Sequence, residues 1–289
     1  MSFPLVLSGI HALALLAVVV AAAAGSGFRI LRLLGVRDAD RETVWAGMAL
    51  GLGVLSLGTM ALGMLGILKT WPVAALLAGL ILWGWPGLKA ASAALRGSDR
   101  LPLPVLAIGL LGLALLGICL MPPHQYDSLV YHLSLPETYV LEGRLVSPQH
   151  LLYSHFPQNA EMLFSLALVL KSDVLAQMFM WLSTALCLAW VFDAGRRELG
   201  EGPALVALGL CATHTALMLL ATITYVEPLV MLWTCAAVLS SWRWVAGAGK
   251  EGESWLWVSA VFSGLALGTK YTGGATAALL ALVPFWRAL

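Results

Sequence analysis

The segment PPHQYDSLVYHLSLPETYVLEGRLVSPQHLLYSHFPQNAE, residues 122–161, interrupts a chain that otherwise consists largely of apolar runs. No other polar break between these runs is as long, and this one contains four of the six histidines and a single cation, Arg144. A connection of this length inside a compact protein is usually functional or disordered. Because Leu, Tyr, Val and Phe recur in it at helical intervals, we expect an ordered segment.

The composition predicts an all-α, polytopic membrane protein. Of the 289 residues, 60% are hydrophobic and 11% are charged, whereas a soluble domain has about 25% charged residues. Several apolar runs reach the roughly 20 residues with which a helix crosses a bilayer. We predict about nine membrane helices. They are placed at residues 4–24, 44–68, 72–88, 103–121, 173–193, 203–222, 228–246, 255–269 and 273–289. The net charge of +1, without a basic cluster, indicates no nucleic-acid partner.

The apolar run at residues 160–170 decides the topology, because it is too short to cross the bilayer unaided. If it does not cross, twelve of the 16 cations lie on one side and four on the other; if it does, the split is seven to nine, or eight to eight. The twelve are Arg29, Arg32, Arg37, Arg41, Lys89, Arg96, Arg100, Arg196, Arg197, Arg243, Lys250 and Arg287, and the four are Lys69, Arg144, Lys171 and Lys270. The positive-inside rule favours the first arrangement. The outer loop, residues 122–172, then faces the exterior, with residues 160–170 lying in or dipping into the outer interface.

Two short amphipathic helices, at residues 128–142 and 160–170, are expected on the outer membrane surface. Asp127 precedes the first of them and follows the apolar run that ends near Met121. Its carboxylate therefore lies at the boundary between membrane and water. The local sequence supports two interpretations equally: a functional carboxylate, or an N-cap for the helix that follows.

Three ionisable side chains, Asp127, Glu227 and Lys270, are predicted to meet at the outer interface. Each has a structural alternative: Glu227 precedes Pro228 as an acid at a helix start, and Lys270 could extend toward water from an apolar position. Charged groups at membrane depth are nonetheless functional candidates, and here three of them converge on one face. We therefore predict a shared site.

No metal or other cofactor is indicated. The histidine spacing matches no standard metal site. All four cysteines lie within apolar runs, which is typical of buried cysteines without a disulfide or metal role. Dependence on a divalent ion stays open.

Four segments, YDSLVYHLSLPETYVLEGR, YSHFPQNAEMLF, TYVEP and GLALGTKYTG, together resemble the GT-C superfamily of glycosyltransferases over roughly residues 103–289. These integral membrane enzymes use polyprenyl-phosphate-linked sugars and include protein O-mannosyltransferases and the aminoarabinose transferases of lipid A. The resemblance implies a GT-C-like membrane domain at residues 101–289, preceded by additional membrane helices at residues 1–100. It also implies later helices and a C-terminal domain, so we expect the chain to be an N-terminal portion of such an enzyme.

The resemblance also implies residue roles. Asp127 corresponds to the first-loop acid that acts as catalytic base, and Glu227 lies where a second outer-loop acid occurs, more often as Asp. Thr269 and Lys270 resemble an element near the lipid phosphate. The remaining substrate-binding candidates are Tyr126, Tyr131, His132, Arg144, His155, Gln158 and Tyr271.

The implied reaction is transfer of a sugar from a polyprenyl-phosphate donor to a hydroxyl of a glycan, lipid or protein. A single base without a carboxylate nucleophile implies inversion at the anomeric carbon. The implied location is the bacterial inner membrane, with the site facing the periplasm or exterior, and the activity of this chain alone stays open.

Two other classes of function stay open. In a transporter or a lipid or glycan permease, the acids and the lysine would form an ion pair or relay, although the sequence has no convincing internal repeat of the transporter kind. The third class is a non-catalytic membrane assembly subunit. Sugar transfer would separate the first class from the other two, and substrate counterflow would identify a transporter.

Overall fold

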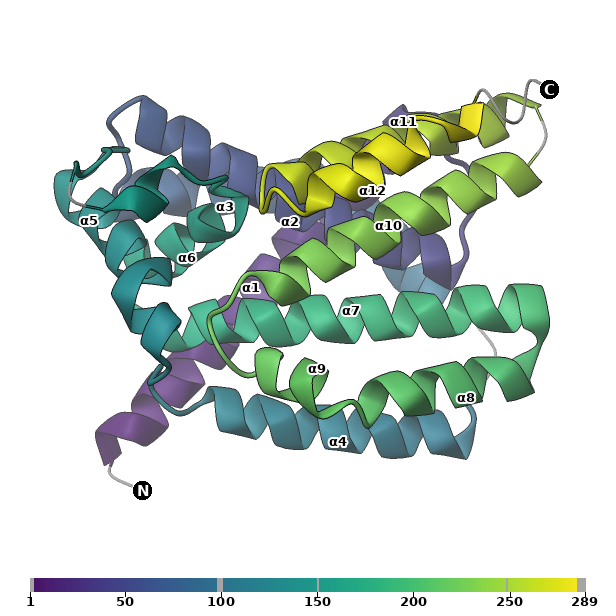
Figure 1. Ribbon diagram of the computed structural model, residues 1–289, viewed down its shortest axis with the longest axis horizontal. Coiled ribbons are helices and arrows are strands. Elements are labelled where there is room, and N and C mark those ends of the chain that lie inside the picture. The colour runs from purple at the N-terminus through teal and green to yellow at the C-terminus, as the bar shows by residue number, and fades with distance from the viewer. Residues whose placement is uncertain (1–2, 98–100, 150, 248, 285–289) are drawn as a thin grey trace.

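The computed structural model describes residues 3–97, 101–149, 151–247 and 249–284, and all secondary structure in these ranges is helical (Figure 1). This confirms the predicted all-α membrane fold. The helices of the first part are α1 (Phe3–Leu33), α2 (Arg41–Met64), α3 (Thr70–Arg96) and α4 (Leu103–Cys119). The outer loop contains η1 (Ser128–His132), α5 (Ser134–Glu142), η2 (Leu152–His155) and α6 (Asn159–Val169). The last part contains α7 (Asp173–Leu199), α8 (Glu201–Ala212), α9 (Thr215–Leu220), α10 (Glu227–Ala246), α11 (Gly249–Leu267) and α12 (Gly273–Leu280).

Five of the described helices, α1, α2, α3, α7 and α10, are long and apolar enough to cross a membrane. Five of the nine predicted spans therefore correspond to helices that could cross a membrane, and within the described residues the other four do not. The run at 203–222 is divided into α8 and α9 near His214, whose Nδ1 accepts a hydrogen bond from the Leu217 backbone N–H at 3.3 Å. A side chain that caps a new helix start ends the continuity of the preceding helix.

The other three predicted spans differ for simpler reasons. Helix α4 has 17 residues, below the roughly 20 of a full crossing. Helix α11 begins with the charged sequence GKEGE, and α12 has eight residues. Residues 285–289 of the last predicted span lie outside the described residues, as does Arg100.

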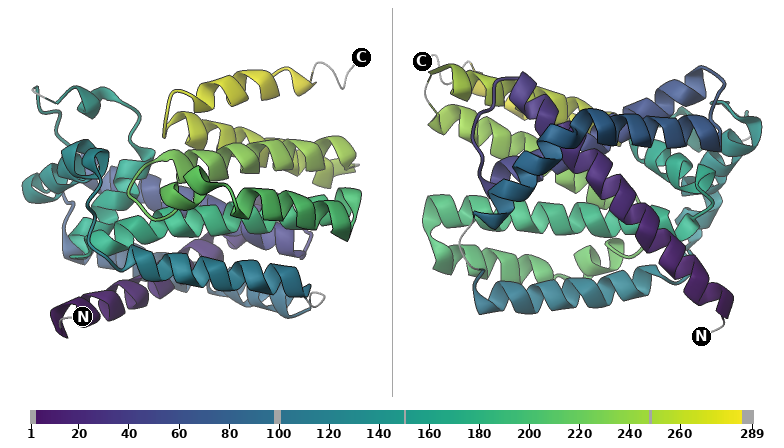
Figure 2. Two further views of the ribbon diagram at one scale, coloured as in Figure 1. Left: turned by 60° about the horizontal axis from the view of Figure 1, so that its bottom comes forward. Right: turned by 180° about the vertical axis from the view of Figure 1, so that it is seen from behind.

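Helix α1 crosses α2 and α3 at very short range, as Figure 2 shows from behind. Glycines make this approach possible: a Cβ at Gly51 would lie 2.0 Å from the Ala23 carbonyl oxygen, and one at Gly84 would lie 2.5 Å from the Gly25 carbonyl carbon. Small residues at such crossings let helix backbones make van der Waals contact in an apolar solvent. Helices α10 and α11 form the other extensive pair, and α10 also contacts α7.

The antiparallel helices bring charged residues to two opposite ends of the bundle. At one end Arg197 of α7 and Arg243 of α10 bond to carboxylates at the start of α2, Glu42 and Asp40 respectively. The outer loop, the start of α10 and the turn after α11 lie at the other end (Figure 1). Lys270 therefore lies at the opposite end from the arginines, in keeping with the predicted cation sorting.

Helix α6 is short, as predicted, but it does not lie on the surface. Apart from one partly buried position, its 11 residues are buried, and they contact α2, α5 and α7. The expectation of an amphipathic surface helix was wrong for this segment. Its sequence is apolar around the whole circumference apart from Asn159, Glu161 and Ser165, and a helix of that kind must be surrounded by protein or lipid.

Asn159 anchors the start of α6 to two other elements. Its backbone N–H donates to the Gly268 carbonyl oxygen at 2.9 Å, and its Nδ2 donates to the Leu265 carbonyl oxygen at 3.1 Å. Its own carbonyl accepts from Ser56 Oγ at 2.7 Å. These bonds hold the beginning of α6 between α2 and the end of α11, beside the turn that carries Lys270.

Candidate active site

A cavity of about 350 Å³ lies where the outer loop meets the start of α10 and the turn after α11. Aromatic side chains form much of its wall, and the polar groups on it come from four different parts of the chain. Its lining residues are Tyr131, His132, Leu135, Tyr153, Phe156, Pro157, Glu161, Val226, Thr269, Lys270, Tyr271 and Thr272. An apolar, largely aromatic pocket with a few converging polar groups is the usual form of a small-molecule site.

Lys270 and Glu227 form an ion pair at this cavity. Lys270 Nζ lies 2.6 Å from Glu227 Oε1, and about two fifths of each side chain is exposed (43% and 38%). Glu227 Oε2 is buried and has no hydrogen-bond partner. Glu227 also lies in the first turn of α10, where an acid at a helix start was the alternative interpretation. The Lys270 ammonium contacts this carboxylate, so it does not extend into water alone.

Asp127 lies at the N-cap position of η1, yet its carboxylate forms no capping hydrogen bond there. Burial raises the pKa of Tyr131, and the nearby negative charges of Asp127 and Glu227 raise this pKa further. Both carboxylates therefore lie within electrostatic reach of one hydroxyl on the cavity wall, although Asp127 itself is not a lining residue. The geometry removes the capping alternative and leaves the carboxylate available to another group.

His132 and Glu161 form a second pair, and both side chains are almost completely buried (5% and 7% exposed). His132 Nδ1 lies 2.9 Å from Glu161 Oε1, and the His132 ring centroid lies 4.1 Å from that of Tyr131. Glu161 was missed as a site residue, although an acid within the short apolar run was a usable signal. Tyr153 and Phe156, which line the same cavity, were missed as well.

Several other predicted residues hold the outer loop around the cavity. Tyr271 lines it and donates through its hydroxyl to the His155 carbonyl oxygen at 3.4 Å, while the His155 side chain is exposed. Gln158 accepts from the Tyr139 hydroxyl at 3.4 Å and donates to the Tyr153 carbonyl oxygen at 3.0 Å. Burial raises the pKa of Tyr139 to about 12, so its hydroxyl stays a proton donor at neutral pH.

Arg144 and Tyr126 are not brought to the cavity. Arg144 lies 3.8 Å from Glu142 in an exposed pair at the end of α5, and the Tyr126 side chain is 76% exposed. Helix α5 ends at Gly143, whose φ of 67° is favourable only for residues such as glycine, and the chain turns away there. The geometry gives Arg144 no contact with the other predicted site residues.

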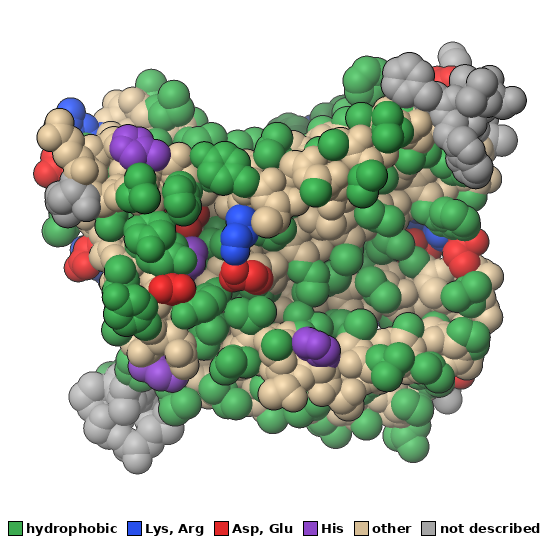
Figure 3. Space-filling model, viewed as in Figure 1, with side chains coloured by type: hydrophobic (Ala, Val, Ile, Leu, Met, Phe, Trp, Pro, Cys, Tyr) green, Lys and Arg blue, Asp and Glu red, His purple; other side chains and the backbone are tan. Residues whose placement is uncertain are grey.

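The face of the molecule seen in Figure 3 is mostly hydrophobic, and acidic and basic side chains meet in a small group near its centre. Within the described residues, no group of three or more His, Cys, Asp or Glu side chains is arranged to hold a metal ion.

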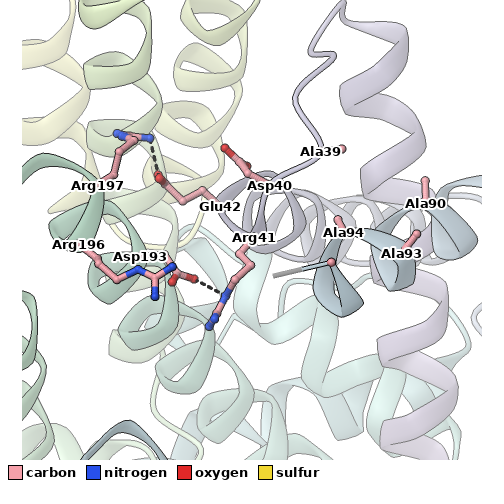
Figure 4. A pocket seen from close by; sticks show the side chains of 11 residues that line it. Ala39, Asp40, Arg41, Glu42, Ala90, Ala93, Ala94, Asp193, Arg196 and Arg197 are labelled. Carbon is pink, nitrogen blue, oxygen red and sulfur yellow. Dashed lines mark hydrogen bonds and ion pairs between the residues drawn. The ribbon is translucent and has the colours of Figure 1, made fainter. Parts of the chain in front are cut away.

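A larger cavity of about 750 Å³ lies at the opposite end, between α2, α3 and α7 (Figure 4). Two ion pairs join its charged side chains: Arg41 Nε lies 3.0 Å from Asp193 Oδ2, and an Arg197 NH group lies 2.6 Å from Glu42 Oε1. Asp193 Oδ2 also accepts from Trp45 Nε1 at 2.7 Å. These bonds tie α2 to α7, so we regard the smaller, aromatic cavity as the candidate site.

Comparison with known families identifies the chain at this point. Residues 135–289, more than half of the chain, match the family described as dolichyl-phosphate-mannose-protein mannosyltransferase. The chain belongs to this family. It is therefore a membrane glycosyltransferase of the GT-C type, as the resemblance in the outer loop and the later segments implied. No curated protein and no solved structure matches it.

The matched region contains Glu161, Glu227 and Lys270, whereas Asp127 and His132 lie shortly before it. Family membership therefore applies directly to most of the cavity wall, whereas Asp127 directly precedes η1, which contributes Tyr131 and His132 to that wall.

Proposed function

We propose that this protein transfers a sugar from a polyprenyl-phosphate donor to an acceptor hydroxyl, with Asp127 as the general base. The observation that carries the proposal is the position of the Asp127 carboxylate, which forms no capping hydrogen bond, near a cavity lined by Lys270 of the Lys270–Glu227 pair. A base and a phosphate-binding cation are the two charged groups that such a transfer needs.

In the proposed step, the acceptor oxygen attacks the anomeric carbon while its proton moves to the Asp127 carboxylate. The bond between that carbon and the phosphate oxygen breaks, and its electron pair stays with the polyprenyl phosphate. Because the attack occurs opposite the leaving group and no enzyme-bound sugar forms, the anomeric configuration inverts. The base and the phosphate-binding group must therefore lie on opposite sides of the sugar.

Lys270 is the group proposed to receive the developing negative charge on the phosphate. An ammonium has three N–H donors, and the observed bond to Glu227 uses one of them. The remaining donors can reach a phosphate oxygen while Glu227 holds the side chain in place. Charge stabilisation by a positioned cation is a large component of catalysis at such sites.

We place the cavity on the extracytoplasmic side of a bacterial inner membrane. The positive-inside rule supports this orientation, because the arginines of α7 and α10 lie at the end opposite Lys270. A donor with a polyprenyl tail would remain in the bilayer and present its phosphate at the height of the interface.

The test uses the full chain purified into liposomes, with radiolabelled mannosyl-phosphoryl polyprenol as the donor. Acceptors are a peptide with serine and threonine, a glycolipid and an oligosaccharide. We expect a labelled product whose anomeric configuration, measured by NMR, is opposite to that of the donor. Donor that remains intact with every acceptor would contradict the proposal, and label counterflow without a new glycosidic bond would indicate a transporter instead.

A further inference from the structure

Two carboxylate oxygens at the cavity, Glu227 Oε2 and Glu161 Oε2, are buried without a hydrogen-bond partner, and the Glu161 carboxylate has no role in the proposed reaction. Glu161 Oε2 is buried and has no hydrogen-bond partner, while Oε1 of the same carboxylate is engaged by His132 at 2.9 Å. Leaving a buried polar atom unpaired is unfavourable by about 1–3 kcal/mol, and more for a charged group. Buried unpaired groups in native proteins therefore call for a specific explanation, such as a ligand that supplies the missing partner.

The orientation of this carboxylate is fixed by its surroundings. Glu161 is held on α6, whose start is anchored by Asn159 to α2 and α11. His132 in turn lies against Tyr131 and Phe164, with ring-centroid distances of 4.1 and 6.3 Å. Because both partners are immobilised, the Glu161 carboxylate has a defined position in the wall of the cavity.

The part of the cavity wall that is not polar consists of aromatic rings in contact with one another. The Tyr131 and Tyr153 rings are stacked, with centroids 4.0 Å apart and planes inclined by 10°. Phe156 meets Tyr153 edge-on at 5.5 Å, and Tyr271 meets Phe156 at 6.0 Å. The rings form a continuous chain from η1 to the turn that contains Lys270.

An aromatic wall and a buried hydrogen-bond acceptor together suit a sugar. A pyranose ring presents apolar C–H groups on its faces and hydroxyl donors around its edge, and a carboxylate oxygen accepts such donors strongly. The volume agrees: at ~30 Å³ for each water-sized group, a cavity of about 350 Å³ accommodates roughly a dozen heavy atoms, which is the size of one hexose.

We propose that Glu161 is the sugar-recognition residue of this cavity, with Oε2 accepting a hydroxyl of the donor sugar and the aromatic rings covering a face of that sugar. The inference rests on the proposed function and adds to it a separation of roles. Lys270 contacts the phosphate, whereas Glu161 contacts only the sugar. A change at Glu161 must then affect binding of the sugar-bearing lipid and leave binding of the bare lipid phosphate unaltered.

The test compares the dissociation constants of mannosyl-phosphoryl polyprenol and polyprenyl phosphate for the wild type and for Glu161→Gln. Gln keeps the size of the side chain and an acceptor for His132 but removes the charge. We expect the preference of the wild type for the sugar-bearing lipid to fall about tenfold in the variant, because hydrogen bonds to charged groups are the stronger kind. Glu161→Ala should lower it further.

The bare lipid is the internal control, since a variant that has lost its fold would bind neither lipid. Glu142→Gln, an exposed glutamate outside the cavity, is the matched control and should behave as the wild type. An unchanged preference in both Glu161 variants overturns the assignment while leaving the proposed function intact. The same holds if the wild type binds both lipids equally. Failure of the wild type to bind either lipid would instead count against the proposed function itself.

Discussion

Lys270 Nζ donates to Glu227 Oε1 at 2.6 Å and so joins the turn after α11 to the first residue of α10. The pair is only partly buried, and ion pairs at such positions contribute little to stability, typically 0–1 kcal/mol. The main effect of the pair is on position, because it keeps the Lys270 ammonium in the wall of the aromatic cavity.

Lys270→Ala should weaken binding of polyprenyl phosphate about tenfold or more, because it removes a charged hydrogen bond to the phosphate. Lys270→Arg should recover part of that loss, since the charge remains but the planar guanidinium has a different shape. Fluorescence titration with polyprenyl phosphate measures both effects. Lys69→Ala removes an exposed lysine at the same end and serves as the control. Equal affinities of the wild type and Lys270→Ala would exclude a phosphate contact.

Asp127→Asn should abolish sugar transfer without destabilising the protein. The amide cannot accept a proton at neutral pH, and general-base catalysis typically contributes ~10²–10⁴-fold. Stability should not change, because the carboxylate makes no capping hydrogen bond. The measurements are initial transfer rates and thermal unfolding in detergent, with Glu137→Gln as an exposed acidic control in the same loop. Transfer at the wild-type rate would eliminate Asp127 as the base.

Membrane orientation can be tested with two exposed glutamates that the topology places on opposite sides, Glu142 at the end of α5 and Glu201 at the start of α8. In a background lacking the four native cysteines, a cysteine at position 142 should react with an impermeant thiol reagent in intact cells. A cysteine at position 201 should react only after the membrane is permeabilised. The reverse pattern would refute the orientation derived from the cation distribution.

The sequence predicted those features that depend on local composition. Apolar runs gave the long helices, and the position of Lys270 after one of them and of Glu227 before another predicted that these side chains would meet. The cation count treats residues 160–170 as a segment that does not cross, and the helix found there, α6, has 11 residues, fewer than the roughly 20 of a crossing. These inferences succeed because hydropathy and charge are properties of short segments.

The features that the sequence did not reveal depend on contacts between distant segments. Which helices surround α6 depends on such contacts, and so does the pairing of Glu161 with His132, 29 residues away. Arg144 looked equivalent to the other charged residues of the loop until the turn at Gly143 directed it away from the cavity. Tertiary packing decides such cases, and periodicity alone does not contain it.

Asp40 is predicted to stabilise the start of α2 in a pH-dependent manner. Burial raises its pKa, but hydrogen bonds and charge from Arg243 and bonds from Thr43 outweigh this and hold the pKa below its usual value. A carboxyl group with a lowered pKa stabilises the fold at neutral pH, and this contribution is lost as the pH falls through that lowered pKa. Asp40→Ala should cost ~1 kcal/mol through loss of the cap alone.

Asp40→Asn separates the two contributions, because Asn is an equally good cap but carries no charge. Its stability should lie between those of the wild type and Asp40→Ala at pH 7, and it should lack the acid-dependent loss. Chemical unfolding in detergent at pH 7 and at about pH 3.5 provides the comparison. Identical unfolding of the Asn and Ala variants at pH 7 would show that the cap has no effect.

Gly268 and Asn159 provide a final test of how the site is held together. A Cβ at Gly268 would lie 2.4 Å from Asn159 Nδ2, which is itself bonded to the Leu265 carbonyl oxygen. Gly268→Ala should therefore displace the Asn159 side chain and break that bond, at a cost of about 1–3 kcal/mol for the carbonyl left unpaired. Asn159→Ala breaks the same bond directly and also makes room for the added methyl group. The double variant should consequently be more stable than the sum of the two single changes predicts, by about 0.5–3 kcal/mol. Unfolding free energies of the four proteins give this coupling.

Because α6 carries Glu161 only two residues after Asn159, the single variants should also reduce the preference for the sugar-bearing lipid more than they reduce binding of polyprenyl phosphate. Strict additivity of the two changes would show that the methyl group at position 268 does not act through the Asn159 side chain, and the backbone bond between Asn159 and Gly268 would then be the remaining link between α6 and the end of α11.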